Sequence, residues 1–213
     1  MKNLKLILFW SLTSLFTLPA VADMSPELLS LSENWARIKY QTPEDQRVAK
    51  LESLSQDAES LVKAHPGEAA PLVWQGIILS TLAGEKGGLG ALSLVNRAKE
   101  LLEQAEAIEP DVLDGSVYTS LGSLYYQVPG WPIGFGDDDK AQTYLQKALA
   151  VNPDGMDPNY FYGDFLMQEE EYAQAAAAFE HALNAPQRNR PIADAGRRSE
   201  ITAALNKTRS MME

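Results

Sequence analysis

Cysteine is absent from this chain of 213 residues, and histidine occurs only twice. Without cysteine the protein can form no disulfide, no thiolate metal site and no cysteine nucleophile, and it cannot carry the lipid-modified cysteine of a bacterial lipoprotein. The two histidines, His65 and His181, have no neighbouring residue pattern that predicts a metal site. We therefore expect no metal or thiol chemistry from these residue types.

Basic residues are also scarce, because 18 lysines and arginines stand against 29 aspartates and glutamates, for a formal net charge of −11. A surface of this sign repels phosphate backbones and anionic lipid headgroups, so nucleic acid is not an expected partner. One local concentration of arginine comprises Arg188, Arg190, Arg197 and Arg198, which we interpret as a solvated cluster. A hydrophobic content of 45% excludes wholesale disorder.

The N-terminus has the pattern of a secretory signal peptide. A basic start at residues 1–5 precedes an apolar run, 6–18, that only Ser and Thr interrupt, and small residues follow up to Ala22. This pattern predicts a signal peptide over 1–22, cleaved after Ala22, and the run is too short to span a bilayer comfortably. We expect no membrane span after cleavage. A short Lys-rich leader on a chain without disulfides favours the periplasm of a Gram-negative bacterium.

The same spacing of small and large apolar residues occurs three times along the chain. Counting from an alanine, a large apolar residue follows at +4, a second alanine at +7 and a proline at +12, or one residue earlier in the third set. The sets are Ala98, Leu102, Ala105 and Pro110; Ala141, Leu145, Ala148 and Pro153; and Ala175, Phe179, Ala182 and Pro186. These steps place the residues on one stripe of a helix that the proline ends. Each set therefore predicts the second helix of a pair.

An apolar segment with a central glycine precedes each set and predicts the first helix of the pair. These segments are 72–81 around Gly76, 118–127 around Gly122 and 160–168 around Gly163. A glycine in the first helix and a small, large, small pattern in the second resembles the tetratricopeptide repeat (TPR), a helix-turn-helix unit of about 34 residues. The third pair matches the family best, with Phe179 as its aromatic residue, whereas Leu102 and Leu145 replace that aromatic in the first two pairs.

The resemblance implies an all-α fold, a right-handed helical solenoid of about three TPR-like helix pairs with flanking helices. The expected divisions are N-terminal helices within 23–66, at 26–40 and 43–64, a repeat region over 67–186, and a capping helix, 191–212, within 187–213. The chain also resembles uncharacterised periplasmic TPR proteins of bacteria and, more distantly, the TPR-like T component of TRAP transporters. It departs from that component because the lipoprotein cysteine is absent.

Two insertions lengthen the connections between the helices of the first two pairs. The first, 83–90, is rich in glycine but lacks the Gly-Lys-Ser/Thr end of a phosphate-binding loop, so we interpret it as a flexible turn, with the next helix beginning near Ala91. The second, 128–136, contains Trp131, Ile133 and Phe135. These side chains either fold back onto the neighbouring repeat or form part of a ligand-facing rim. The two insertions are expected to lie side by side.

No motif in the sequence predicts catalysis. Neither Gly115 nor Gly122 begins a Gly-x-Ser-x-Gly nucleophile elbow. The acidic run 137–139 lacks the alternating ligand spacing of a calcium loop, and we interpret it as the N-terminal cap of the next helix. Asp154 and Asp157 are interpreted as turn and cap residues as well. We therefore predict a non-enzymatic protein with no cofactor and no metal.

The resemblance also implies a groove lined by one face of the first helices. By position this face holds Val73, Ile77, Ser80, Thr119, Ser123, Tyr126, Tyr160, Asp164 and Met167. Together with Trp131 and Phe135 they are the candidate partner-binding residues, although each aromatic can equally serve packing between repeats. The implied function is a scaffold for a protein or peptide partner. The alternative is a small-molecule or lipid carrier, which predicts a closed apolar cavity of roughly 300 Å³ or more.

Overall fold

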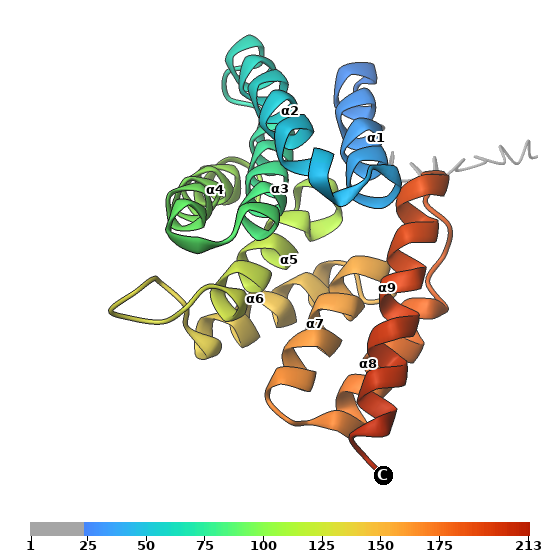
Figure 1. Cartoon of the computed structure of the whole chain (residues 1–213). Coiled ribbons are helices and arrows are strands. Elements are labelled where there is room, and N and C mark those ends of the chain that lie inside the picture. Colours follow the sequence, from blue (N-terminus) through green and yellow to red (C-terminus); the bar gives the residue numbers. More distant parts are fainter. Residues whose placement is uncertain (1–23) are drawn as a thin grey trace, which may run out of the picture.

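A computed structural model describes residues 24–213, and the predicted signal peptide, 1–22, lies outside the described residues. The described part of the chain forms nine α-helices and no strand, so the all-α prediction is confirmed (Figure 1). The helices are α1 (Pro26–Gln41), α2 (Glu44–Ala64), α3 (Ala69–Lys86), α4 (Gly88–Ile108), α5 (Val112–Gln127), α6 (Asp138–Val151), α7 (Met156–Gln168), α8 (Tyr172–Leu183) and α9 (Pro191–Ser210). Within residues 24–213, none of these helices is both long enough and apolar enough to cross a membrane.

Local sequence signals set several helix ends. Helix α1 begins after Ser25, whose Oγ accepts a hydrogen bond of 3.2 Å from the backbone N–H of Leu28. Helix α6 begins after Asp137, whose carboxylate accepts a hydrogen bond of 3.1 Å from the N–H of Lys140, so the predicted acidic cap is confirmed. The predicted helices 26–40, 43–64 and 191–212 agree with α1, α2 and α9 to within two residues at each end.

One close contact recurs where α3 packs against α4, α5 against α6 and α7 against α8. A Cβ atom added to Gly76 would lie 2.9 Å from Leu102 Cγ, one on Gly122 would lie 2.7 Å from Leu145 Cγ, and one on Gly163 would lie 2.8 Å from Phe179 Cε1. Each glycine thus lets its partner helix approach closely, with the large residue of the predicted set resting on it. The sequence spacing therefore identified the residues at the centre of each contact.

The first insertion is a correction to the sequence analysis, because 83–90 is not a flexible turn. Helix α3 continues to Lys86 and α4 begins at Gly88, earlier than Ala91, so that Gly87 alone joins them. Gly87 has φ of 61°, a left-handed conformation that glycine adopts without steric cost. The extra residues therefore lengthen two helices, and they provide no loop that could share a rim with the second insertion.

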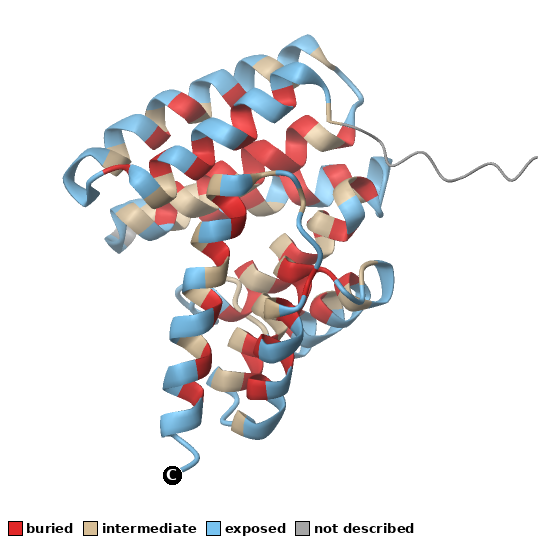
Figure 2. Ribbon diagram, turned by 90° about the vertical axis from the view of Figure 1, so that its right-hand side faces the viewer, coloured by how far each residue is buried: buried red, intermediate tan, exposed pale blue. Residues whose placement is uncertain are grey.

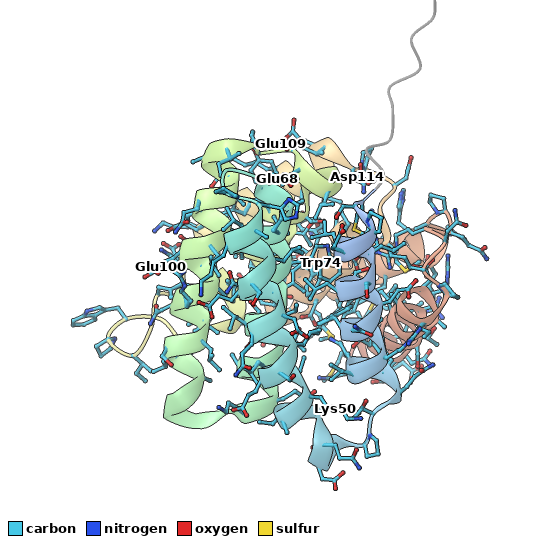
Figure 3. The ribbon with its side chains drawn as sticks, turned by 90° about the horizontal axis from the view of Figure 1, so that it is seen from above. Lys50, Glu68, Trp74, Glu100, Glu109 and Asp114 are labelled. Carbon is cyan, nitrogen blue, oxygen red and sulfur yellow. The ribbon has the colours of Figure 1, made fainter. Side chains whose placement is uncertain are left out.

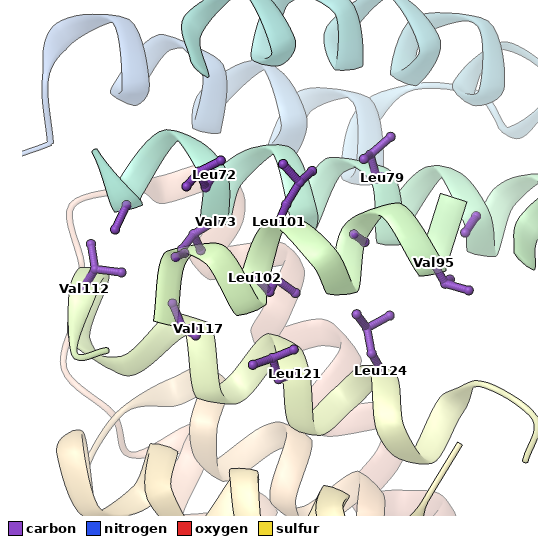
Figure 4. Close-up of a cluster of buried hydrophobic side chains, with 14 of the residues drawn as sticks. Leu72, Val73, Leu79, Val95, Leu101, Leu102, Val112, Val117, Leu121 and Leu124 are labelled. Atoms are coloured by element: carbon purple, nitrogen blue, oxygen red, sulfur yellow. The ribbon is translucent and has the colours of Figure 1, made fainter. Parts of the chain in front are cut away.

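Three clusters of buried apolar side chains fill the described structure. The first lies between α3, α4 and α5 and includes Leu102 and Leu121 (Figure 4). The second joins residues of α5 to α9 and includes Phe179, and the third holds α1 and α2 against α3 around Trp35. Figure 2 shows the buried positions on the sides of the helices that face one another. No single central core exists in residues 24–213, since each cluster serves neighbouring helices.

The first and last described helices also contact each other. Helix α1 packs on α9, and Figure 1 shows α1 in blue beside the upper end of α9 in red. The ring of Tyr40 lies directly on Gly196, where an added Cβ atom would come within 2.3 Å of Tyr40 Cγ. This contact brings the first and the last described helices together, and α9 also packs against α7.

Candidate functional site

The most exposed large apolar side chains lie on the second insertion, which we call the α5–α6 loop (residues 128–137). Trp131 is 90% exposed and Ile133 is 64% exposed. Figures 1 and 3 both show this loop projecting beyond the helices. Phe135, four residues after Trp131, is instead half-buried against α4, α5 and α6. Phe135 therefore folds back onto the neighbouring helices, as the first alternative predicted, whereas Trp131 and Ile133 face solvent. A role of these two residues in a ligand-facing rim stays a prediction.

Backbone hydrogen bonds order the base of the α5–α6 loop. The N–H of Gly136 donates to Pro129 O over 3.0 Å, the N–H of Ile133 donates to Gly130 O over 3.1 Å, and the N–H of Asp137 donates to Tyr125 O over 2.8 Å. The two arms lie so close that a Cβ atom on Gly136 would be 2.0 Å from Val128 O. The loop therefore presents Trp131 from a closed, hydrogen-bonded base.

Aromatic rings and lysines support this base. Tyr125 and Tyr144 stack with ring centroids 5.6 Å apart and planes 7° apart, and Phe135 meets Tyr125 edge-on at 5.7 Å. Lys99 Nζ lies 5.6 Å from the Phe135 ring centroid, and Lys147 Nζ lies 4.8 Å from that of Tyr144. We call these five residues the Tyr144 cluster. It anchors the loop to α4, α5 and α6.

Tyr144 is held in place by a hydrogen bond from its hydroxyl to Glu106 Oε2, 3.1 Å away. Partial burial and the nearby negative charge of Glu106 raise the pKa of Tyr144 above its usual value near 10. The ring therefore stays a neutral phenol across the physiological pH range and presents its face to Lys147 and Tyr125.

Three of the predicted groove residues lie in the interior of the molecule. Val73, Thr119 and Tyr126 are all buried, with Val73 in the first apolar cluster and Tyr126 in the second. The Thr119 hydroxyl donates to Gly115 O over 3.4 Å. Val73 and Tyr126 are covered by the neighbouring helices, so their placement on a partner-facing groove is corrected. Thr119 is also buried, but it lines a pocket between the start of α5 and the start of α7.

The other residues of the predicted face are half-buried and engaged in packing. Ile77 packs against two apolar clusters, Met167 packs against the second, and the Ser80 and Ser123 hydroxyls donate to backbone carbonyls one helical turn earlier. Asp164 Oδ2 accepts a hydrogen bond of 2.7 Å from the Tyr126 hydroxyl. Burial raises the pKa of both Asp164 and Tyr126. This pair joins α5 to α7 and is a packing element.

The arginine cluster is a further correction, because Arg197 is not solvated. Its side chain is buried, its Nε lies 2.8 Å from Asp157 Oδ1, and its Nη1 lies 2.6 Å from Glu200 Oε2. Arg188 pairs with Asp157 and, over 2.8 Å, with Asp194. Burial by itself would raise the pKa of Asp157, but Arg188 and Arg197 outweigh it and hold the pKa well below its usual range.

This ionic network joins the two ends of the fold. On α1, the Tyr40 hydroxyl donates to Glu200 Oε2 over 3.1 Å, and Lys39 Nζ lies 3.2 Å from Glu200 Oε1. On α7, the ring of Tyr160 lies 4.5 Å from the guanidinium carbon of Arg197. We call Asp157, Arg188, Asp194, Arg197 and Glu200 the ionic core. Arg197 and Glu200 are an i,i+3 pair on α9, but Asp157 lies 31 and 40 residues from Arg188 and Arg197. The sequence analysis missed the ionic core because charge spacing along the chain carries no signal for such distant pairs.

Two pockets lie near the ionic core and the contact of α1 with α9. One, of about 180 Å³, has a wall of mixed polar and apolar character and lies between the start of α5, the start of α7 and the α8–α9 connection. Its wall includes Leu113 and Asp114, two non-glycine residues with φ of 52° and 55°. The other, of about 110 Å³, is mainly apolar and lies between α1, α3 and the start of α9. Neither pocket reaches the roughly 300 Å³ expected of a carrier for drug-sized ligands.

No family model matches this sequence, and no curated protein matches it either. The geometry defines the chain, over residues 24–213, as an all-helical protein with an exposed apolar loop on one side and an ionic core on the other. Any finer assignment rests on the internal pattern of the sequence and on the contacts described above.

Proposed function

We propose that this protein is a non-enzymatic, exported TPR-type scaffold of the periplasm that binds a protein partner through the α5–α6 loop. The observation that carries the proposal is the 90% exposure of Trp131 on a hydrogen-bonded loop. A large apolar ring facing water is costly in a soluble protein, and tryptophan is among the residues most enriched at the energetic centres of interfaces.

The repeated helix contacts support the TPR part of the proposal. In three successive pairs a glycine of the first helix receives the large side chain of the second helix, at Leu102, Leu145 and Phe179. Such repetition of one contact is typical of repeat proteins, which stack similar helix pairs and often bind partners on loops or faces that the stacking leaves open.

The placement of Trp131 favours a partner that offers an apolar pocket. Ile133 lies close in sequence on the same exposed turn, and the Tyr144 cluster beneath adds lysine ammonium groups around aromatic faces. A central aromatic anchor, a second apolar contact and a charged rim are the usual layout of a protein interface. The ordered base limits the conformational entropy that binding has to remove.

The carrier alternative receives no support from the two pockets near the contact of α1 with α9. The two pockets described measure about 110 and 180 Å³, and helices α1 and α9 are in contact with each other. A lipid or drug-sized ligand would have to separate these helices before it could be enclosed. The exposed loop needs no such rearrangement, so it is the better-supported binding element.

The test compares partner capture by three forms of the mature chain, residues 23–213, from crosslinked periplasm. The wild type should recover a partner that Trp131→Ala loses. Ile108→Ala removes another exposed apolar side chain, at the end of α4, and should recover that partner in the same yield. Equal recovery by all three forms, or loss in both variants, would sink the assignment of the loop as the binding element.

A further inference from the structure

The larger of the two pockets, between α5, α7 and the α8–α9 connection, has two side chains of opposite charge in its wall that lack an ion-pair partner. They are Arg190, which is half-buried, and Asp114, which is exposed. Among residues 24–213 neither side chain makes an ion pair or a hydrogen bond, whereas Arg188 and Asp157 of the same wall pair with each other. The unpaired charges of this wall are therefore one cation and one anion.

The charge of Arg190 lies among the charged groups of this pocket. Burial and the neighbouring charge of Arg188 lower the pKa of Arg190. The negative charges that oppose this shift are those of Asp157, Asp194 and Asp114. Except for Asp194, all of these neighbours line the pocket. A guanidinium stays protonated in proteins, so the pocket contains a cation that has no carboxylate of its own.

Arg190 also belongs to the wall of the smaller pocket, between α1, α3 and the start of α9. The carboxylate of that pocket, Glu33, lies 3.7 Å from Arg37 and is therefore already paired. Only the larger of these two pockets combines Arg190 with an unpaired carboxylate.

A strained turn carries Asp114 at the pocket wall. Leu113 and Asp114 have φ of 52° and 55°, and Gly115 follows with φ of 76°. The left-handed conformation is disfavoured for a bulky residue such as leucine, and it persists only where the surrounding structure imposes it. Backbone strain of this kind concentrates at ligand sites. Figure 3 shows Asp114 near the outer edge of the molecule, where a ligand can approach it from solvent.

The wall and the volume select the kind of molecule that fits. A carboxylic acid alone would leave Asp114 unpaired, and an amine alone would leave Arg190 unpaired. A volume of about 180 Å³ has room for roughly six waters at ~30 Å³ each, which suits a ligand of about as many non-hydrogen atoms. The apolar part of the wall comprises Leu113, Met156, Pro158 and Pro186.

We propose that this pocket binds a small neutral α-amino acid as its zwitterion, with the ligand carboxylate on the guanidinium of Arg190 and the ligand ammonium group on the carboxylate of Asp114. Both contacts are hydrogen bonds between ionised groups, which are stronger than neutral ones. The apolar part of the wall receives the short side chain of the ligand. The site is independent of the α5–α6 loop, and it adds recognition of a small molecule to the proposed scaffold.

The probe for this site is L-alanine, titrated into mature protein labelled with ¹⁵N and followed by NMR. We expect saturable shifts of the backbone amide signals of Gly155 and Met156, which line the pocket, and no shift of the exposed Trp131 indole. Propionate and ethylamine each lack one of the two charged groups, and each should bind at least about tenfold more weakly than alanine. An absence of saturable alanine binding, or equal binding of alanine and either analogue, overturns the proposal.

Asp114→Asn tests the contact with the ammonium group. Asparagine tolerates the left-handed conformation, so the turn is retained while the negative charge is removed. The preference of the wild type for alanine over propionate should disappear in this variant. Asp111→Asn, an exposed position outside the wall, is the matched control and should keep the preference. A preference that survives in Asp114→Asn contradicts the assignment of this carboxylate.

Arg190→Gln tests the contact with the carboxylate of the ligand in the same way. The preference for alanine over ethylamine should disappear in this variant and persist in Arg209→Gln, which changes an exposed arginine at the other end of α9. Circular dichroism verifies that each variant is folded, and if Arg190→Gln does not fold, Asp114→Asn decides. A retained preference in folded Arg190→Gln shows that the guanidinium does not hold the ligand and overturns the proposal.

Discussion

The α5–α6 loop and the ionic core invert the usual distribution of side chains. The loop holds Trp131 and Ile133 in solvent, whereas the ionic core buries Arg197 and holds the half-buried carboxylates of Asp157 and Glu200 against it. The loop makes backbone hydrogen bonds within itself and leaves its apolar tips uncovered. The ionic core joins α1, α7 and α9 and leaves few of its charges to water. One region is therefore available to a partner, and the other stabilises the fold.

The comparison shows that the exposure of a side chain in this protein depends on which segments pack over it and not on its residue type. Phe135 and Trp131 belong to one loop, yet only Phe135 meets an aromatic surface, that of Tyr125. Arg198 and Arg209 belong to one helix, but Arg198 donates to backbone carbonyls at the end of α8 and just after it, and Arg209 pairs with exposed Glu180. Four substitutions test this contrast, from the largest expected effect to the smallest.

Arg197→Ala should break the ionic core and give the largest loss of stability. The variant leaves Asp157 and Glu200 without their central cation, and removal of one partner from a buried ion pair costs about 3 kcal/mol or more. Urea unfolding measured by circular dichroism gives the free energy of unfolding. Arg209→Ala, which removes an exposed pair with Glu180, is the control and should cost below about 1 kcal/mol. Similar losses in both variants would contradict the special role of the ionic core.

Asp157→Asn should destabilise the protein by about 2 kcal/mol at neutral pH, because Arg188 and Arg197 lose their shared carboxylate. The folded-state pKa of Asp157 lies below the ordinary value of 3.8, so its charge adds stability that is present above pH 3.8 and is lost as pH falls through the folded-state value. The difference between wild type and variant should therefore shrink below pH 3.8. Urea unfolding over a pH series checks this.

The control for the pH series is Asp57→Asn, an exposed position on α2 that belongs to no ion pair among residues 24–213. Its curve should run parallel to that of the wild type. If the gap between wild type and Asp157→Asn stays constant to low pH, the carboxylate charge is not what Asp157 contributes.

Phe135→Ala should have an intermediate effect, with a loss of about 1 kcal/mol. The ring is half-buried and contacts Tyr125 and Lys99, so its removal uncovers part of the Tyr144 cluster without emptying a closed core. Thermal unfolding measures the effect. A loss as large as that of Arg197→Ala would mean that the loop base is a principal core element.

Trp131→Ala should leave stability within about 0.5 kcal/mol of the wild type, because the indole touches little of the protein. The same substitution should abolish recovery of the proposed partner. Thermal unfolding and partner capture on one preparation check both statements. A large fall in melting temperature would show that Trp131 packs in solution and would remove the main support for the proposed function.

Much of the helical architecture was predictable because its signals are local. Spacings of three and four residues define a helix face, glycine marks a close approach, and proline ends a helix. The residue pattern alone therefore pairs each first-helix glycine with a large residue of the second helix, as at Gly163 and Phe179. The first insertion was misjudged because glycine-rich sequence favours a turn, and nothing local shows that one residue, Gly87, suffices to make it.

The candidate site was predictable only in part. The α5–α6 loop stood out because several large apolar residues lie between prolines and glycines, but the sequence left open which of them faces solvent. The groove residues were chosen from the family resemblance, and Val73, Thr119 and Tyr126 proved to be buried. Their burial depends on how closely successive helix pairs and the two ends of the chain approach, a distance that no single segment specifies.

The sequence by itself determined the helices, their pairing and the absence of thiol chemistry, since each follows from residue type and short-range spacing. Tertiary structure alone decided that Arg197 is buried against Asp157, that α1 meets α9, and that the indole N–H of Trp74 is buried without a hydrogen-bond partner among residues 24–213. The physical reason is range: helix formation depends on neighbours within one or two turns, whereas burial and ion pairing depend on which distant segments the folded chain brings together.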